Sequence, residues 1–184
     1  MKGFGKEARP KKKLNHERNK HQYHQILNEA FKCHSSGNIS EAKKYYQYLI
    51  KEGFQNADVF NNCGIILKEL GQYKEAGLYF QKSIDINPSD EKSYANFSGI
   101  LKELGKFREA ELYIRKAIKL NPQNPISYSN LGSILIKLGY CKEAYLSINK
   151  AIELNPDLAD AHLNLGIVLM DFGKLHEAKL SVCK

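Results

Sequence analysis

The stretch NFSGILKELGKFREAELYIRKA, from Asn96 to Ala117, contains the pattern that the rest of the chain repeats. Its apolar residues recur three and four apart on both sides of Gly105, which predicts two amphipathic helices joined by a short turn. The same arrangement returns every 34 residues, with a glycine followed four residues later by a Glu-Ala pair. The five glycines are Gly37, Gly71, Gly105, Gly139 and Gly173. One period in five copies predicts an all-α solenoid of tandem helix–turn–helix units.

Three residue types mark the expected helix ends. Glycine adopts a left-handed backbone conformation without steric cost and is therefore expected to end each first helix. The glutamate of each Glu-Ala pair falls in the first turn of the second helix, where a carboxylate stabilises the positive end of the helix dipole. Proline cannot continue a helix, so the second helices are expected to end at Asn87-Pro88, Asn121-Pro122 and Asn155-Pro156.

Counting from Tyr23 divides the chain into numbered positions within each unit. The units are 23–56, 57–90, 91–124, 125–158 and an incomplete 159–184, preceded by a basic segment, 1–22. Position 20 is alanine in every unit, and position 8 is always small: Ala30, Gly64, Ser98, Gly132 and Gly166. Small residues at facing positions let two helices approach closely, so we expect tight helix pairs.

A small residue at position 8, glycine at 15, alanine at 20 and proline at 32 resemble the tetratricopeptide repeat family over residues 23–184. The resemblance implies a right-handed superhelical solenoid whose concave groove is lined by the first helix of each unit. It also implies a non-enzymatic protein that binds a protein or peptide partner. The first unit departs from the pattern, with Glu29 at an apolar position and Phe54 in place of proline, as expected of an N-terminal cap.

Residues 1–22 contain almost no large apolar side chains, so we expect them to be disordered. They hold eight Lys or Arg and two Glu, and therefore six of the eight net positive charges. This segment is interpreted either as a solvating tail or as a contact for a polyanion. Nucleic acid is not the expected partner. No apolar run reaches the ~18 residues of a membrane span, and no secretory signal is recognised, so a cytoplasmic location is expected.

No pattern of catalytic or metal-binding residues is found. The chain lacks nucleophile, metalloprotease and phosphate-loop motifs, and the histidines have no nucleophile partners in sequence. The four cysteines form no C-x-x-C pair and are interpreted as small buried apolar residues. We therefore expect no enzyme activity, no metal and no cofactor.

Position 6 is asparagine in every unit and lies opposite the apolar stripe of the first helix. The residues are Asn28, Asn62, Asn96, Asn130 and Asn164. A carboxamide can both accept and donate hydrogen bonds, as a peptide backbone requires. The series resembles the asparagine ladder in the repeat region of O-linked N-acetylglucosamine transferases, which implies peptide binding. Alternatively, the amides hydrogen-bond across the interface between first helices or to backbone.

Three further residues are expected in the groove: Asn61, Ile65 and Lys92. The family's carboxylate clamp requires a lysine at position 5 and an asparagine at position 9, and no unit has that pair. A receptor for acidic chaperone tails is therefore not expected. Apolar or small residues at position 9, such as Ile65 and Gly99, suit an unstructured peptide segment.

The sequence thus favours an interaction scaffold that binds extended peptides in its concave groove. One alternative is an accessory region that recruits substrates for a glycosyl- or sulfotransferase, because similar repeats often precede such domains. Another is polyanion binding through residues 1–22. The fifth unit stops at Lys184 without a capping helix, which makes self-association through the C-terminal end a further expectation.

Overall fold

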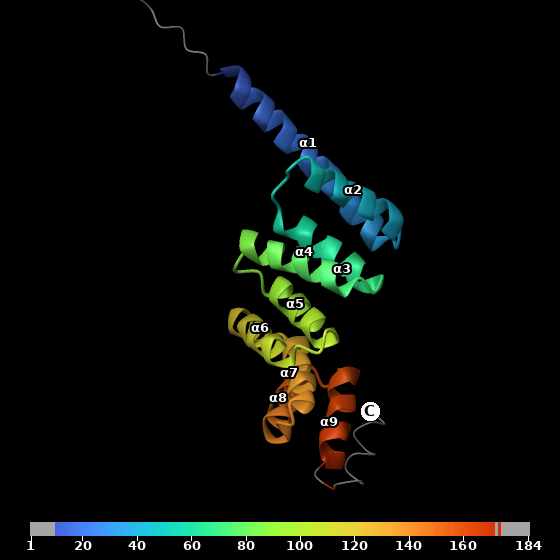
Figure 1. Cartoon of the computed structure of the whole chain (residues 1–184), viewed down its shortest axis with the longest axis vertical. Helices are drawn as coiled ribbons and strands as arrows, with labels where there is room; N and C mark the ends of the chain where they lie inside the picture. Colours follow the sequence, from blue (N-terminus) through green and yellow to red (C-terminus); the bar gives the residue numbers. More distant parts are fainter. Residues whose placement is uncertain (1–9, 172, 174–184) are drawn as a thin grey trace, which may run out of the picture.

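The computed structural model describes residues 10–171 and 173, and these form helices and turns without any strand. Figure 1 shows the helices stacked along the long axis of the molecule. Their bounds are α1 Pro10–Ser35, α2 Ile39–Lys51, α3 Ala57–Glu69, α4 Tyr73–Ile86, α5 Glu91–Glu103, α6 Phe107–Leu120, α7 Pro125–Lys137, α8 Cys141–Leu154 and α9 Ala159–Asp171.

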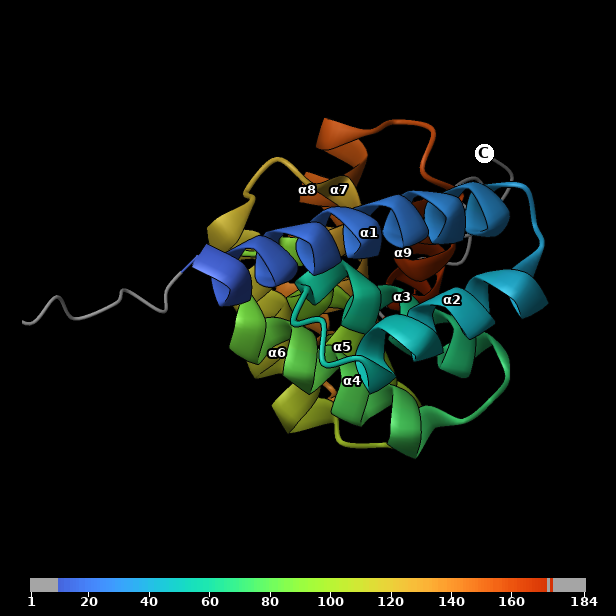
Figure 2. The same ribbon diagram turned by 90° about the horizontal axis from the view of Figure 1, so that it is seen from above.

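Neighbouring helices pack in pairs, and the pairs stack into a solenoid. Each odd-numbered helix from α1 to α7 contacts the next helix along the chain, and each even-numbered helix contacts the first helix of the following unit. The first helices α3, α5, α7 and α9 also contact one another in that order, so they share one face of the stack. Figure 2, along the stack, shows the helix pairs overlapping. The predicted all-α solenoid is confirmed.

The glycines end the first helices as expected. Gly71 and Gly105 have φ angles of 72° and 73°, in the left-handed region. The N–H of the residue after each glycine donates to a carbonyl five residues earlier, from Gln72 to Leu67 and from Lys106 to Leu101, both at 2.8 Å. These bonds satisfy carbonyl groups that a helix end otherwise leaves without partners.

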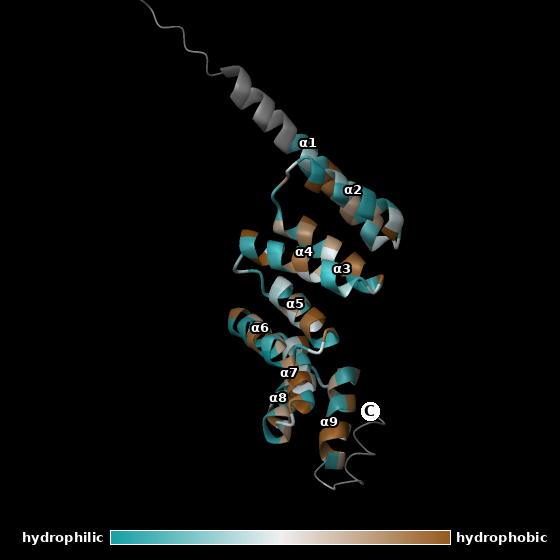
Figure 3. Ribbon diagram, viewed as in Figure 1, coloured by the Kyte–Doolittle hydropathy of each residue, from teal (hydrophilic) through white to brown (hydrophobic). Residues whose placement is uncertain are grey.

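Small residues at position 8 allow close helix packing within each unit. A Cβ atom on Gly64 would lie 2.7 Å from the Phe80 ring, and one on Gly132 would lie 2.4 Å from Cγ1 of Ile148. The two glycines therefore face position 24 of the second helix most closely. Position 8 also faces the alanine at position 20, as expected, because Ser98 Oγ donates to the Ala110 carbonyl at 2.8 Å. Figure 3 shows apolar and polar stretches alternating along the helices, as this one-sided packing requires.

Helix α1 differs from the expected disorder of residues 1–22, because it begins at Pro10 and continues to Ser35, as the first helix of the first unit. Low apolar content limits burial, but it does not prevent a helix that extends from an already packed one. Proline favours the first helical position, and extension avoids the cost of a new nucleus. Residues 1–9 lie outside the described residues. So does 174–184, the end through which self-association was expected.

Candidate functional site: a groove across three first helices

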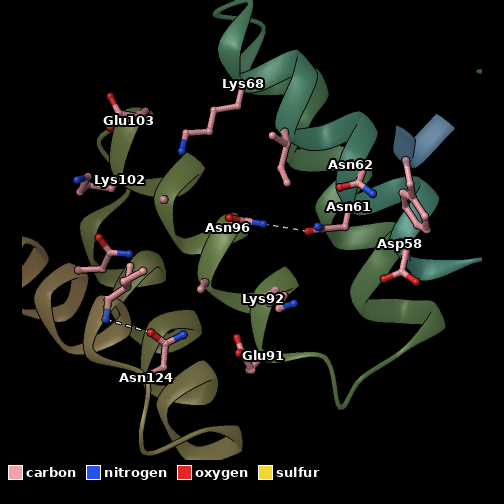
Figure 4. A pocket seen from close by; sticks show the side chains of 16 residues that line it. Asp58, Asn61, Asn62, Lys68, Glu91, Lys92, Asn96, Lys102, Glu103 and Asn124 are labelled. Carbon is pink, nitrogen blue, oxygen red and sulfur yellow. Dashed lines mark hydrogen bonds between the residues drawn. The ribbon is translucent and has the colours of Figure 1, made fainter. Parts of the chain in front are cut away.

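A groove with a volume of about 570 Å³ crosses α3, α5 and α7. Figure 4 shows side chains from successive helices converging on it. Its apolar members are Phe31, Ile65, Ala95 and Ile126, together with Gly99. Its asparagines are Asn61, Asn62, Asn96, Asn124 and Asn130, and its charged residues are Asp58, Lys68, Glu91, Lys92, Lys102 and Glu103. The groove therefore offers amide, apolar and ionic contacts to an extended ligand.

Six of the eight residues predicted for the groove line it. They are Asn61, Asn62, Ile65, Lys92, Asn96 and Asn130. Asn28 instead borders a separate depression on α1, which it shares with Phe31 and Tyr45. Asn164, on α9, does not line the groove. The asparagine series is thus divided, with three of its five members in one groove.

Two of the position-6 asparagines hydrogen-bond the first helix of the preceding unit. Asn96 Nδ2 donates to Asn61 Oδ1 at 3.0 Å, from α5 to α3. Asn164 Nδ2 makes the corresponding bond to Ser129 Oγ at 3.3 Å, from α9 to α7. Both acceptors occupy position 5 of the unit before. The interface role that we considered as an alternative therefore holds for these two residues.

Two other members of the series have different surroundings. Asn62 lies near the Tyr46 hydroxyl, whose pKa is raised by burial and by the nearby Cys63, while the Asn62 amide opposes the shift. Asn130 is half-buried, and the residue at position 5 of the preceding unit is Ala95, which has no polar side-chain atom. No hydrogen bond of the Asn130 amide is found among the described residues. Asn130 is thus the groove asparagine whose amide is least committed to the fold.

Interface bonding and ligand binding are compatible within one amide. A carboxamide has two N–H donors and a carbonyl with two lone pairs. The bond to Asn61 uses one donor of Asn96, so its other donor and its carbonyl remain, and the bond holds the amide in one orientation. Asn61 itself is only 9% exposed, and its carbonyl oxygen is already an acceptor. Asn61 therefore belongs to the groove wall.

The charged groups of the groove are balanced, with three lysines and three carboxylates. Among the described residues, no salt bridge includes Lys68, Lys92 or Lys102. Lys68 and Lys102 were missed from the sequence, although they stand at position 12, one helical turn after position 9. Including the residues one helical turn beyond position 9 would have predicted them as groove residues. Figure 4 shows Lys68 extending from α3 towards α5.

The described side chains line a groove, and they do not assemble a catalytic centre that we recognise. No group of three or more His, Cys, Asp or Glu side chains within the described residues could hold a metal ion. Burial raises the pKa of the Cys63 thiol to about 12, so it stays protonated and is a poor nucleophile at neutral pH. None of the described helices has the length and hydropathy needed to cross a bilayer.

Solved structures of other proteins share this fold. MamA from Desulfovibrio magneticus RS-1 superposes with a TM-score of 0.77 at 19% identity, covering 88% of this chain and 91% of that chain. Another MamA crystal structure gives a TM-score of 0.73 at 19% identity, with 84% and 90% of the two chains covered. YrrB, described as a TPR protein with an unusual peptide-binding site, gives 0.73 at 21% identity, with 94% and 89% covered.

Comparison with curated protein sequences finds no match. Models of the tetratricopeptide repeat match residues 57–90, 91–124, 126–158 and 148–179, which together make up more than half of the chain. These matches agree with the helix pairs, the left-handed glycines and the stacked first helices described above. The chain therefore belongs to the tetratricopeptide repeat family.

Proposed function

We propose that this protein is a non-enzymatic interaction scaffold that binds an extended peptide segment of a partner protein in the groove across α3, α5 and α7. The observation that carries the proposal is the convergence of Asn62, Asn96 and Asn130, from three consecutive units, on one groove of about 570 Å³. Solenoids of stacked repeats bind partners along such concave surfaces. YrrB, which has the same fold, is described as having a peptide-binding site.

Binding would combine main-chain and side-chain contacts. The amides of Asn96 and Asn130 can donate to and accept from a peptide backbone, whatever the peptide sequence. Ile126 is 56% exposed in the groove and would gain from covering by apolar side chains of the ligand. An unstructured peptide loses conformational entropy when it is ordered, so the affinity is expected to be modest.

The first prediction compares two asparagines at the same repeat position. Asn130→Ala should weaken binding to an array of unstructured peptides about 5- to 10-fold, because its amide is available to a ligand. The same change should leave the unfolding midpoint nearly unaltered, since no interface bond is lost. Fluorescence anisotropy with the best peptides of the array measures the affinity, and circular dichroism verifies the helix content.

The matched control is Asn164→Ala. Asn164 lies outside the groove and donates to Ser129, so this variant should lose a little stability and retain the peptide affinity. Equal affinities for intact protein and Asn130→Ala would mean that the groove asparagines do not hold the ligand. Failure of the intact protein to retain any peptide would overturn the proposed function.

A further inference from the structure

Gly99 has no evident structural reason to be glycine. Its φ angle is not in the left-handed region where Gly105 and the other turn glycines lie. It does not permit a close helix contact either, because a Cβ atom placed on it would meet no atom within 4 Å. Gly64 and Gly132 differ, since a Cβ there would lie less than 3 Å from Phe80 or Ile148.

A glycine in the interior of a helix lowers stability relative to alanine, since it loses more backbone entropy on folding. Gly99 stands within α5, which runs from Glu91 to Glu103, and it lines the groove. Glycine is the residue that lets a ligand approach a backbone closely. The open space above Gly99 is therefore space in the ligand-binding groove itself.

The surroundings of this space combine apolar side chains with an excess of positive charge, since two lysines and one carboxylate, Glu103, line the groove one helical turn beyond position 9. Ala95 and Gly99 are one helical turn apart on α5, and Ile65 lines the same groove from α3. The two lysines at position 12, Lys68 and Lys102, line it as well, and no salt bridge among the described residues includes either of them. Their aliphatic stems can cover an apolar group while their ammonium groups contact an anion.

We infer, on the basis of the proposed function, that Gly99 is the anchor position of the groove. It receives one large apolar side chain, the size of leucine or phenylalanine, from an extended segment of a partner protein. An acidic residue next to that anchor faces Lys68 and Lys102, which outnumber the single carboxylate, Glu103, at this end of the groove. The groove thus selects an internal apolar–acidic motif, with Asn96 and Asn130 holding the main chain on either side.

The test uses synthetic unstructured peptides of ten residues, in which the central residue is Ala, Leu or Phe and its neighbours are Asp or Lys. The intact protein should bind the Leu and Phe peptides with Asp neighbours about tenfold more tightly than the Ala peptides. Gly99→Leu fills the space from the protein side, so it should reduce that preference to about twofold or less. Ser133→Leu, at position 9 of the next unit, is the matched control and should keep the preference.

A second variant separates binding from folding. Gly99→Ala should raise the unfolding midpoint by about 2 °C, because it removes a glycine from a helix interior where a Cβ has room. It should also reduce the affinity for the Phe peptide more than that for the Ala peptide.

The outcomes distinguish the inferred anchor position at Gly99 from the proposed binding of peptides in the groove. Binding without a preference for a large central residue, or a preference that survives in Gly99→Leu, would overturn the anchor and leave the groove proposal standing. A preference for Lys neighbours over Asp neighbours would also overturn the proposed motif. If no peptide of the set binds the intact protein, both the anchor and the proposed function fail.

Discussion

The contact between α4 and α5 and the contact between α8 and α9 use the same repeat positions with opposite chemistry. Ser83 and Ser93 meet in the first contact, and Ala151 and Ala161 occupy the same positions in the second. All four residues are completely buried. The same backbone arrangement therefore accommodates either two hydroxyl groups or two methyl groups. The hydroxyl groups need hydrogen-bond partners, and the methyl groups need only apolar packing.

The hydroxyl pair is satisfied by a local network. Ser83 Oγ donates to the Ala57 carbonyl at 2.8 Å and lies 2.8 Å from Ser93 Oγ, which in turn donates to the Asp90 carboxylate. Each hydroxyl has one proton: Ser93 donates to Asp90, and the proton of Ser83 is shared between the Ala57 carbonyl and Ser93 Oγ, so neither hydroxyl is buried without a partner. Ser93 also lies 3.5 Å from Asn61 Oδ1, which connects the network to the groove.

The α8–α9 contact lacks the groups that such a network needs. The position of Asp90 is occupied by Leu158, so a second buried hydroxyl would have no carboxylate to donate to. Alanine avoids the desolvation cost of a polar group without a partner. At the α4–α5 contact the polar residues therefore satisfy one another, and through Asn61 they support the wall of the groove.

The largest expected effect concerns the packing that both regions share. Phe80 and Ile148 stand at position 24 of their units and are completely buried. Phe80→Ala should lower the free energy of unfolding by about 3–5 kcal/mol and Ile148→Ala by about 2–5 kcal/mol, through lost burial and a residual cavity. Urea denaturation followed by circular dichroism measures both.

The controls for this packing are two exposed leucines, two residues earlier on the same helices. Leu78 and Leu146 are 72% and 68% exposed, so their replacement by alanine should cost less than about 0.5 kcal/mol. If Phe80→Ala and Leu78→Ala were equally destabilising, burial at position 24 would not be the source of stability.

The next prediction concerns two cysteines, Cys63 on α3 and Cys141 on α8. The folded protein keeps the Cys63 thiol protonated up to about pH 12, because burial raises its pKa from 9.0. The unfolded chain releases the same proton near pH 9, so stability is fully present below pH 9 and declines as the pH rises towards 12. The slope is about 1.4 kcal/mol per pH unit for one fully linked group.

Thermal unfolding between pH 8 and 11 under reducing conditions measures this slope. The neighbouring charges of Lys43 and Glu75 act on Cys63 in opposite directions, and the buried Tyr46 and the half-buried Tyr79 also titrate in alkali with raised pKa values. Cys63→Ala removes only the thiol contribution and should flatten the decline. Cys141→Ala, on α8, is the control. Desolvation and the Asp171 carboxylate also raise the pKa of Cys141, but its side chain is partly exposed, so this variant should flatten the decline less than Cys63→Ala does. An unchanged slope in Cys63→Ala would refute the account.

The smallest effect concerns the hydroxyl pair itself. Ser83→Ala and Ser93→Ala should each cost about 1 kcal/mol. The double variant should cost about 1 kcal/mol less than their sum, because both single changes break the same bond. The reciprocal cycle, Ala151→Ser with Ala161→Ser, should give a smaller coupling energy, since the introduced hydroxyls have each other but Leu158 offers no carboxylate to complete the network. Additive costs at Ser83 and Ser93 would show that the network is not a unit.

Much of the fold followed from the sequence, because its signals are local. Gly105 ends a helix through its own φ angle, and Asn121 ends one because proline follows it. The small residue at position 8 predicted close packing, although only the structure identified Phe80 and Ile148 as the side chains that fill the space. For residues 10–22 the low apolar content predicted disorder, whereas the structure shows a helix. Apolar content indicates how much surface a segment can bury, but not whether a neighbouring helix extends into it.

The candidate site was predicted less completely. Six of the eight proposed residues line one groove, because helical periodicity correctly identifies a face. It could not separate Asn28 and Asn164 from the other asparagines, and it did not include Lys68 and Lys102.

By itself, the sequence determined the period of 34 residues, the helix ends and the face of each first helix that carries asparagine. Only the tertiary structure decided what each asparagine does. Asn96 and Asn61 are 35 residues apart and share a hydrogen bond of 3.0 Å, whereas the position facing Asn130 is filled by Ala95. A hydrogen bond requires a partner within about 3 Å and in the right direction. Periodicity sets the direction of a side chain, but the stacking of one unit on the next sets its partner.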